Sequence, residues 1–287
     1  MNSGKPTVSI ITVAKNSAST IKDSIQSVVN QDYPAEQILV DGCSTDNTLE
    51  IMRKYSSRGS RIISEPDRNL YDAMNKGLAL ATGDVVSILN SDDYFAHCGV
   101  LSTVAKVFEN PDVDSCYGDI VYVDPVNTSR IVRYWRSGRY DGKRFYQGWM
   151  PPHPTFVSRR TAYERYGGFN LGIGLSADYE LMLRFLFKHR ISVEYIPEVM
   201  VVMRAGGQGN VSLRNRWRAN RWDKSAWKAN GLKPRPWTMF AKPLSKLGQY
   251  LFKNWDHLPG VGARWWEDPE DRSGGDDVVG LDSERRV

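Results

Sequence analysis

Apolar residues in the first third of the chain form short continuous runs that alternate with amphipathic segments. The runs are rich in Val and Ile and have the length of buried strands. The segments between them repeat their apolar residues at helical spacing behind Ser, Thr or Asn, which favour helix N-termini. The expected strands are residues 7–14, 37–42, 61–67 and 84–93, and the expected helices are 19–31, 44–55 and 69–83.

This alternation predicts an α/β fold, in which a Rossmann-like, mostly parallel sheet is flanked by helices on both faces. The second half is less regular, with strands expected at 114–124 and 192–204 and a strong helix at 175–190. Ligands of such open sheets bind beyond the carboxyl ends of the strands. The residues that follow each strand are therefore the first candidates for a site.

Acidic residues stand where the expected strands end. Asp41 ends the second strand, Asp67 the third, and Asp92 and Asp93 the fourth. We expect these acids to line a common edge of the sheet. Adjacent carboxylates suit Mg²⁺ or Mn²⁺, which completes its coordination with substrate phosphates and water. The alternative is a solvated turn in which Asp92 and Asp93 only end the strand.

Several enzyme classes lack their usual motifs. No GxGxxG follows the first strand and no GxxxxGK[ST] occurs, which disfavours dehydrogenases and P-loop enzymes. A sugar-nucleotide nucleotidyltransferase would share an acidic metal site, but its glycine-rich triphosphate loop is absent from "TVAKNSAST" at 12–20. A third possibility is a non-catalytic glycan- or nucleic-acid-binding protein. Such a protein would not need the Asp92–Asp93 pair together with an acid, Asp178, that opens a helix.

Charge is unevenly distributed. The 287 residues carry a net charge of +5, but residues 211–255 hold eleven Lys or Arg and one acid, a net +10, which leaves −5 elsewhere. Five of the nine tryptophans lie in the same stretch, and beyond Trp266 the chain is acidic and glycine-rich. We expect an α/β domain at 1–210, a basic, Trp-rich, amphipathic helical extension at 211–266 and an acidic disordered tail at 267–287.

Three interpretations of the basic extension compete. Basic charge with aromatic residues suits nucleic acid, but no recognised nucleic-acid-binding module is present. A solvated helical face is the second interpretation. The third is a membrane-surface helix, since Lys, Arg and Trp are typical of contacts with anionic lipid. The apolar stripe of that helix would be Phe240, Leu244, Leu247 and Leu251, with Lys242, Lys246 and Lys253 off it. We favour the membrane surface and expect no nucleic-acid partner.

The rest of the composition suggests a cytoplasmic protein. No stretch approaches the roughly 20 apolar residues of a membrane-spanning helix, and the N-terminus lacks the pattern of a secretory signal. The three cysteines form no CxxC pair and are interpreted as reduced thiols. We therefore expect a cytoplasmic location, peripheral on the inner face of the cytoplasmic membrane.

Four motifs, in this order, resemble glycosyltransferase family 2, and within it bacterial enzymes that build exopolysaccharide, colanic-acid-type and O-antigen units. The motifs are "VDGCSTDNT" (40–48), "SEPDRNLYDAMNKG" (64–77), "ATGD" (81–84) and "LNSDD" (89–93). The resemblance runs from about residue 7 to about 210. It implies a GT-A fold for the catalytic domain, a nucleotide-diphosphate-sugar donor, Mg²⁺ or Mn²⁺, and transfer with inversion at the anomeric carbon.

The resemblance also implies roles for single residues. It places Asp41 on the donor base, Asp92 on the ribose or the metal's surroundings, and Asp93 on the metal. Asp178 stands where the family has the base that deprotonates the acceptor hydroxyl. The acceptor would be a saccharide linked to polyprenyl diphosphate. The further donor contacts that it implies are Thr12, Asp67, Asp72, Asn75 and Lys76.

Structural roles remain open for several of these residues. Asp41 could complete the turn before the next helix, and Asp178 could be an acid favoured by the dipole of a first helical turn. Asp72, Asn75 and Lys76 are spaced to share one polar edge facing the site, but that edge could equally be a solvated helix face.

Possible acceptor or diphosphate contacts come from the second half. They are His153 between prolines, Glu180 as the fallback base, and Gly206 and Gly207 where relatives have a mobile loop. His153 could instead stiffen a turn, and the glycines could belong to a plain surface loop.

Two further features of the sequence concern the nucleotide and the number of sugars transferred. Ala14 and Lys15 replace an aromatic residue that many relatives stack on the base, so the nucleotide stays undetermined. "RANRW" at 218–222, from Arg218 to Trp222, matches the RxxRW signature of processive synthases. Those synthases also have transmembrane helices, so we predict transfer of a single sugar.

Overall fold

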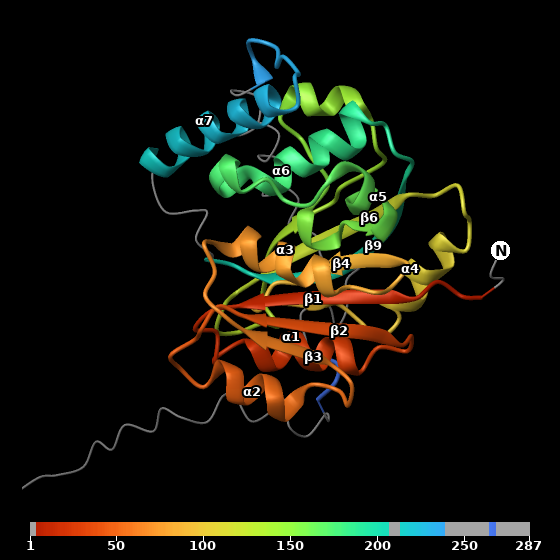
Figure 1. Ribbon diagram of the computed structural model, residues 1–287, viewed down its shortest axis with the longest axis vertical. Helices are drawn as coiled ribbons and strands as arrows, with labels where there is room; N and C mark the ends of the chain where they lie inside the picture. The colour runs from red at the N-terminus through yellow and green to blue at the C-terminus, as the bar shows by residue number, and fades with distance from the viewer. Residues whose placement is uncertain (1–3, 207–212, 239–263, 268–287) are drawn as a thin grey trace, which may run out of the picture.

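The computed structural model describes residues 4–206, 213–238 and 264–267, with only the backbone described at 213–220. These residues form an α/β fold in which one large sheet is covered by helices on both faces (Figure 1). No helix of the described chain has both the length and the apolar composition needed to cross a membrane.

The described strands form a nine-stranded mixed sheet. They are β1 (Val8–Ala14), β2 (Ala35–Asp41), β3 (Arg61–Ser64), β4 (Val85–Ile88), β5 (Asp93–Phe95), β6 (Ser115–Val123), β7 (Ile131–Trp135), β8 (Val157–Arg159) and β9 (Val193–Arg204). Their order is β3-β2-β1-β4-β8-β6-β9-β5, with β7 paired to β6. Strands β1 to β4 are mutually parallel, β8 is antiparallel to β4, and β5 is antiparallel to β9. The predicted α/β class with a mostly parallel half is confirmed.

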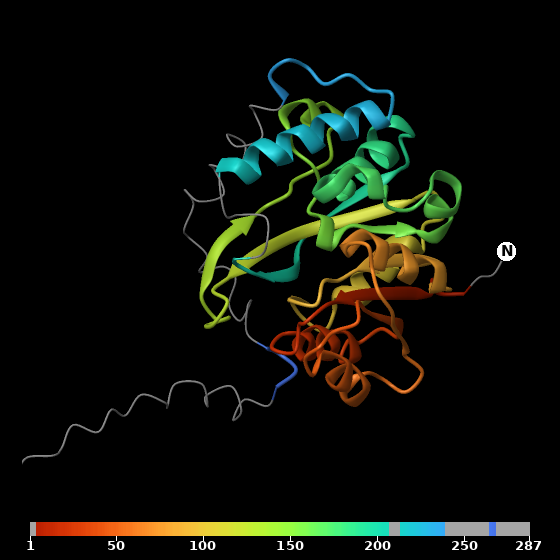
Figure 2. The same ribbon diagram turned by 60° about the vertical axis from the view of Figure 1, so that its left-hand side comes forward.

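Helices lie on both sides of the sheet. They are α1 (Ile21–Val29), α2 (Thr48–Tyr55), α3 (Leu70–Leu80), α4 (Val100–Phe108), α5 (Arg160–Tyr166), α6 (Ala177–Met182) and α7 (Leu213–Ala229), with 3-10 helices η1 (Gly142–Gln147), η2 (His153–Thr155) and η3 (Leu171–Ser176) and a π-helical turn η4 (Leu183–Lys188). The predicted helix at 175–190 is thus α6 continued by η4. In Figures 1 and 2, α3, α6 and α7 lie on one side of β1, and α1 and α2 on the other.

Alternating side chains of β1 enter different core clusters. Ile11 and Val13 pack in the cluster that contains Met74 of α3, whereas Ile10 packs with Val28 of α1. This is the two-residue period of a strand with both faces buried, and it explains the continuous apolar run. Helix α3 approaches closely because Gly77 has no Cβ, which would lie 2.3 Å from a side-chain carbon of Ile11.

The stretch 84–93 is not the single strand that the sequence predicts. Strand β4 ends at Ile88, and a turn follows in which the Asp93 N–H donates to the Asn90 carbonyl, 3.2 Å away. Asp93 then opens β5 opposite Met203 of β9. Asp93 is only 1% exposed, so the solvated turn considered as the alternative does not describe Asp93.

The predicted boundary at residue 210 does not appear as a break in packing. Trp227 of α7 is fully buried, stacks on Tyr146, and donates its indole N–H to the Tyr179 hydroxyl at 3.0 Å. Trp222 lies against the backbone of Gly174. Trp227 therefore belongs to the protein core and Trp222 packs against η3, although the sequence suggested a lipid interface. Helix α7 belongs to the same folded unit as α6.

A second part of the predicted extension also returns to the sheet. Trp265 donates to the Phe95 carbonyl at 2.9 Å, and Trp266 meets the Tyr94 ring edge-on at 5.3 Å between centroids. Residues 264–267 thus lie against β5. The apolar stripe from Phe240 to Leu251 and the acidic tail at 268–287 lie outside the described residues.

Trp227→Ala should lower the free energy of unfolding by about 3–5 kcal/mol, the usual cost of truncating a buried tryptophan. The indole fills the space between α7 and η4 and also loses its bond to Tyr179. Urea unfolding of the full chain measures the change. Trp237→Ala is the matched control, because Trp237 is 52% exposed and should unfold near the wild-type midpoint. Equal effects of the two substitutions would contradict the core role of Trp227.

Candidate active site

Asp41 ends β2 and is fully buried. Its carboxylate accepts hydrogen bonds from the Ser44 hydroxyl at 2.5 Å and from the Ser64 hydroxyl at 2.6 Å. The Ser44 N–H also donates to it at 3.2 Å. The turn role considered for Asp41 is therefore present in the structure. Because the Ser44 N–H lies 3.2 Å from both carboxylate oxygens, these contacts use about all four acceptor positions, and a ligand donor would share or replace one of them.

Asp67 lies beside the residue that follows Asp41. A Cβ on Gly42 would lie 2.6 Å from the Asp67 Oδ2, so glycine is needed for this approach. The Lys76 ammonium contacts Asp67 at 2.7 Å and Glu65 at 3.1 Å. The hydrogen bond to Asp67 is the main cause of the raised pKa of Lys76, which keeps this cation charged. Asp67 and Lys76 thus form one ion pair at the corner of the site.

Asp72 and Asn75 both have hydrogen-bond partners within the protein. Asp72 accepts from the backbone and the guanidinium of Arg68, both at 3.0 Å, and these bonds lower the pKa of Asp72. Asn75 pairs with the backbone N–H and carbonyl of Phe169 at 2.8 and 2.9 Å. These partners give both side chains structural roles, and their contact with the donor stays a prediction.

The turn before β5 holds the most unusual acid. Asp93 accepts a hydrogen bond from the Asn90 amide at 3.0 Å on one oxygen, while its Oδ1 and the Asn90 Oδ1 have no partner among the described residues. Burial, and then the neighbouring charge of Asp92, raise the pKa of Asp93 well above its usual range. Asp92 is half-buried. A cation here would offset both the burial and the repulsion.

Hydrogen bonds connect this turn to the Asp41 corner. The Ser17 and Ser91 hydroxyls are 2.9 Å apart, and the neighbouring Asn16 N–H donates to the Ser44 hydroxyl at 2.8 Å. Ser44 in turn donates to Asp41. Asp41 and Ser91 of the turn are therefore linked through residues 16, 17 and 44 beyond the carboxyl ends of β1, β2 and β4.

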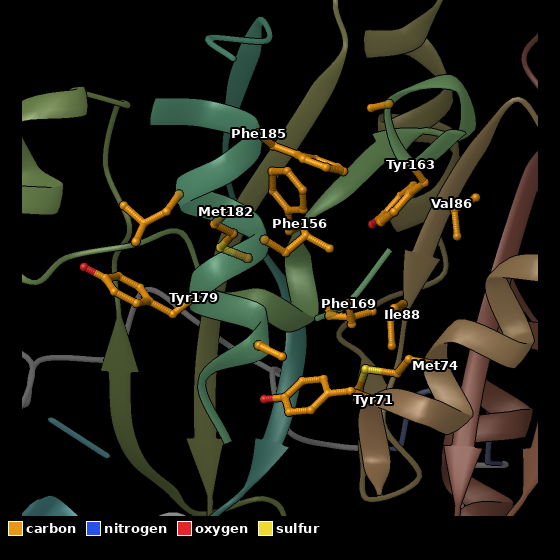
Figure 3. Packing of buried hydrophobic residues seen from close by; sticks show 14 of the residues in the cluster. Tyr71, Met74, Val86, Ile88, Phe156, Tyr163, Phe169, Tyr179, Met182 and Phe185 are labelled. Atoms are coloured by element: carbon orange, nitrogen blue, oxygen red, sulfur yellow. The ribbon is translucent and has the colours of Figure 1, made fainter. Parts of the chain in front are cut away.

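Asp178 lies in the first turn of α6, where it accepts a hydrogen bond from the Tyr71 hydroxyl at 3.2 Å. Figure 3 shows the Tyr71 hydroxyl directed toward the start of this helix. Burial, with the Asp178 charge as the second cause, raises the pKa of Tyr71, so the phenol stays protonated. Tyr71 is not among the site residues expected from the sequence. Its hydroxyl was the one signal that distinguished it from a core Phe.

His153 lies near Asp178. Its ring meets Phe169 edge-on at 6.2 Å, and its Nε2 is buried with no partner among the described residues. Burial lowers the pKa of His153, and the charge of Asp178 opposes that shift. A neutral imidazole with a free ring nitrogen can bind a hydroxyl as donor or acceptor, depending on its tautomer.

Glu180, the fallback base, has a different environment. Its carboxylate contacts the Arg184 guanidinium at 2.9 and 3.1 Å and accepts from the Asn230 amide at 3.2 Å. It is 2% exposed. These partners tie α6 to the end of α7, so we assign Glu180 a structural role and do not retain it as a base.

Thr12 and Gly206 complete the predicted set. Thr12 is fully buried within β1, and its hydroxyl has no partner in the described part of the chain. The donor contact expected of Thr12 therefore stays a prediction. Gly206 is exposed, with a φ of +108° that favours glycine. Gly207 lies outside the described residues.

Solved structures show which class of enzyme shares this fold. Staphylococcus aureus TarS 1–349 in complex with UDP-GlcNAc matches with a TM-score of 0.63 and 16% identity, over 90% of this chain and 78% of that one. A mannosyltransferase from Pyrobaculum calidifontis, in complex with GDP-Man and Mn²⁺, matches with a TM-score of 0.54 and 18% identity, over 91% and 85%. The fold is the GT-A fold of glycosyltransferases.

Sequence comparisons identify the family. The model described as "Glycosyl transferase family 2" matches residues 9–167. A "PGL/p-HBAD biosynthesis glycosyltransferase" from Mycobacterium tuberculosis is 30% identical over 202 residues, 68% of this chain and 75% of the relative. A "Putative teichuronic acid biosynthesis glycosyltransferase TuaG" from Bacillus subtilis is 40% identical over 97 residues, 32% and 38% of the two chains. The chain belongs to glycosyltransferase family 2, which decides for a glycosyltransferase over the other two classes considered.

Proposed function

We propose that this enzyme transfers one sugar from a nucleotide-diphosphate-sugar to a hydroxyl of a saccharide acceptor, with inversion and with Mg²⁺ or Mn²⁺. The observation that carries the proposal is Asp93, a buried carboxylate with a free oxygen beside Asp92. Among the described residues, no three His, Cys, Asp or Glu side chains gather into a metal-binding cluster. Two carboxylates suit a metal that takes its remaining ligands from substrate and water.

On the donor side, Asp93 would hold the ion, and Asp92 would contact the ribose or orient the metal's surroundings. The ion would supply positive charge to the departing nucleoside diphosphate. Asp41 would accept an N–H of the base, sharing or replacing a contact of Ser44, while Ser64 holds its carboxylate in place. Asp67, fixed by Lys76, would accept a ribose or sugar hydroxyl.

On the acceptor side, Asp178 would take the proton from the attacking hydroxyl. A carboxylate is a weak base for an alcohol, so it must lie within hydrogen-bond reach while the donor bond breaks. Tyr71 holds Asp178 by its hydrogen bond, and the free Nε2 of His153 would orient the acceptor hydroxyl. A single displacement with one base gives inversion at the anomeric carbon.

We propose a polyprenyl-diphosphate-linked saccharide as the acceptor, in bacterial surface glycan synthesis on the cytoplasmic side of the membrane. Support comes from the relatives, whose names refer to PGL/p-HBAD and teichuronic acid biosynthesis. A lipid-linked acceptor requires the enzyme to work at a membrane surface.

Exposed basic residues around α7 support peripheral membrane contact. Trp227 and Ala226 face the core, while cations three, four and seven positions apart face outward. Trp237, also exposed, adds an interfacial side chain. The exposed basic side chains of this region are Arg221, Lys224, Lys228, Lys233 and Arg235. We name these five residues and Trp237 the basic face.

The variant Lys224→Glu/Lys228→Glu should lower binding to anionic vesicles on the order of ten-fold or more, at about 1 kcal/mol for each basic residue near the surface. Co-sedimentation at low and high salt measures it, because the screening length falls from about 10 Å at 0.1 M to about 3 Å at 1 M. The variant Arg53→Glu/Lys54→Glu on α2, far from α7 in Figure 1, is the matched control and should bind like wild type. A wild-type chain that stays in the supernatant at low salt would refute membrane contact.

The proposed reaction is tested by titrating UDP- and GDP-sugars with and without Mn²⁺. Calorimetry should show one nucleotide binding tightly only with the metal, and release of the nucleoside diphosphate should require an added saccharide acceptor. Absence of binding under every condition would overturn the donor assignment. Binding that does not depend on a divalent metal would overturn the role of Asp93.

A further inference from the structure

Arg204 connects three segments that lie far apart in the sequence. It is the last residue of β9, and its Nη1 donates to the Asp92 carbonyl at 2.7 Å. Its Nη2 is paired with the Asp23 carboxylate of α1, and both side chains are only 9% exposed. One guanidinium therefore bridges α1 and the backbone of the Asp92–Asp93 turn.

The surroundings make this arrangement rigid. The guanidinium lies over the Tyr94 ring at 5.2 Å, and Trp266 packs on that ring. The Asp23 carboxylate also lies 3.9 Å from the Arg264 guanidinium. Each of the two Arg204 nitrogens has one acceptor, which a planar guanidinium can satisfy at once and an ammonium cannot reproduce.

The sheet alone holds the turn weakly. Strand β5 has three residues and pairs only with β9 among the described strands. Asp92 and Asp93 are adjacent like charges, whose repulsion favours opening of the turn. The Ser24 hydroxyl holds the Asn90 carbonyl at 3.1 Å, which fixes the start of the turn but not Asp92. Arg204 supplies the contact to Asp92.

We propose that Arg204, itself held by Asp23, is a positioning residue that fixes the Asp92–Asp93 turn in the geometry that binds the divalent cation. The inference rests on the proposed metal site and adds its supporting contacts. Groups that orient metal ligands typically change metal affinity by about 10–100-fold when they are altered.

The test uses Arg204→Lys in the full chain, with Arg159→Lys as the matched control. Arg159 also holds backbone carbonyls, those of Val113 at 2.8 Å and Asn110 at 2.9 Å, but it lies on β8 away from the turn. Mn²⁺ binding is followed by electron paramagnetic resonance with UDP and with GDP present. Thermal unfolding of each variant gives its folded fraction at the working temperature.

Arg204→Lys should weaken Mn²⁺ binding about 10-fold or more at full folding, while metal-free nucleotide affinity stays within about two-fold. Arg159→Lys should bind Mn²⁺ like wild type, even if its unfolding temperature falls by as much as that of Arg204→Lys. If Arg204→Lys does not fold, the second variant is Asp23→Asn. This substitution keeps the shape of the Asp23 side chain and weakens its ion pair with Arg204, so it should also lower the affinity for Mn²⁺.

The outcomes separate the inference from the proposed function. If the wild type binds Mn²⁺ and the variant at Arg204 or Asp23 binds it equally well, the positioning role is wrong and the metal site stands. If Arg159→Lys weakens Mn²⁺ binding as much, the effect is general destabilisation and the inference falls. If the wild type binds no Mn²⁺ with either nucleotide, the metal site fails and the inference fails with it.

Discussion

Asp93→Asn should abolish metal-dependent sugar transfer and leave the protein folded. The substitution keeps the size of the side chain and removes the charge that would hold the cation. We choose Asn because Asp93 is buried, and Ala would leave a cavity between β5 and the turn. Transfer in Mg²⁺ or Mn²⁺ should fall by at least 100-fold, on the scale of a lost metal ligand in electrostatic catalysis.

Stability should move in the opposite direction. Burial raises the pKa of Asp93 in the folded protein above its value in the unfolded chain. At a pH between these two values, the folded protein therefore binds the proton more tightly than the unfolded chain does. The charge therefore costs stability as pH rises through the folded pKa, and that cost is absent at low pH. With a chelator at neutral pH, Asp93→Asn should melt at or above the wild-type temperature, and this advantage should shrink near pH 4.

Asp119→Asn is the matched control for a buried aspartate. Asp119 is also 1% exposed, but its carboxylate accepts from Tyr134 at 2.7 Å, the Ser137 N–H at 2.7 Å and Tyr195 at 2.9 Å. Its loss should lower the melting temperature and leave Mn²⁺ binding unchanged. Normal transfer by Asp93→Asn would show that the metal assignment is wrong.

Asp178→Asn should lower turnover by roughly 100-fold or more, because it removes the proton acceptor and leaves the donor site whole. Binding of the metal and nucleotide should stay near wild type, since Asp178 lies on α6 and not in the Asp92–Asp93 turn. Single-turnover transfer and nucleotide titration together separate the two effects. Tyr71→Phe, which removes only the hydrogen bond to Asp178, should cause a smaller loss of turnover.

Glu180→Gln controls for a disturbed helix. Glu180 is in the same turn of α6 as Asp178, but its carboxylate is paired with Arg184. This variant should unfold at lower temperature and keep its turnover per folded molecule. If Asp178→Asn weakened donor binding as much as turnover, Asp178 would be a donor-site or structural residue. If Glu180→Gln lost turnover and kept its stability, the base would have to be reassigned.

The sequence by itself determined two things. One is the order of strands and helices up to residue 83, and the other is the resemblance to glycosyltransferase family 2. Strand β1 is buried throughout and most of β2 is buried, so their runs are largely apolar, whereas β3 is partly exposed and was located by its short Ile-Ile run. Each helix repeats its apolar residues at a fixed spacing. The acids at the ends of these strands were visible for the same reason, because an apolar run ends where the chain leaves the core. Such signals are local, and one sequence is enough to read them.

The tertiary structure decided which polar and aromatic groups have partners. Nothing in 84–93 shows that Asp93 pairs with Met203, or that Arg204 reaches Asp23 across 181 positions. The same holds for Trp227. The basic, Trp-rich segment around it suggests lipid contact, but its indole is buried against Tyr179. Burial and hydrogen bonding depend on segments brought together only by folding. The sequence therefore located the acids, and the fold decided that a carboxylate oxygen of Asp93 has no partner among the described residues.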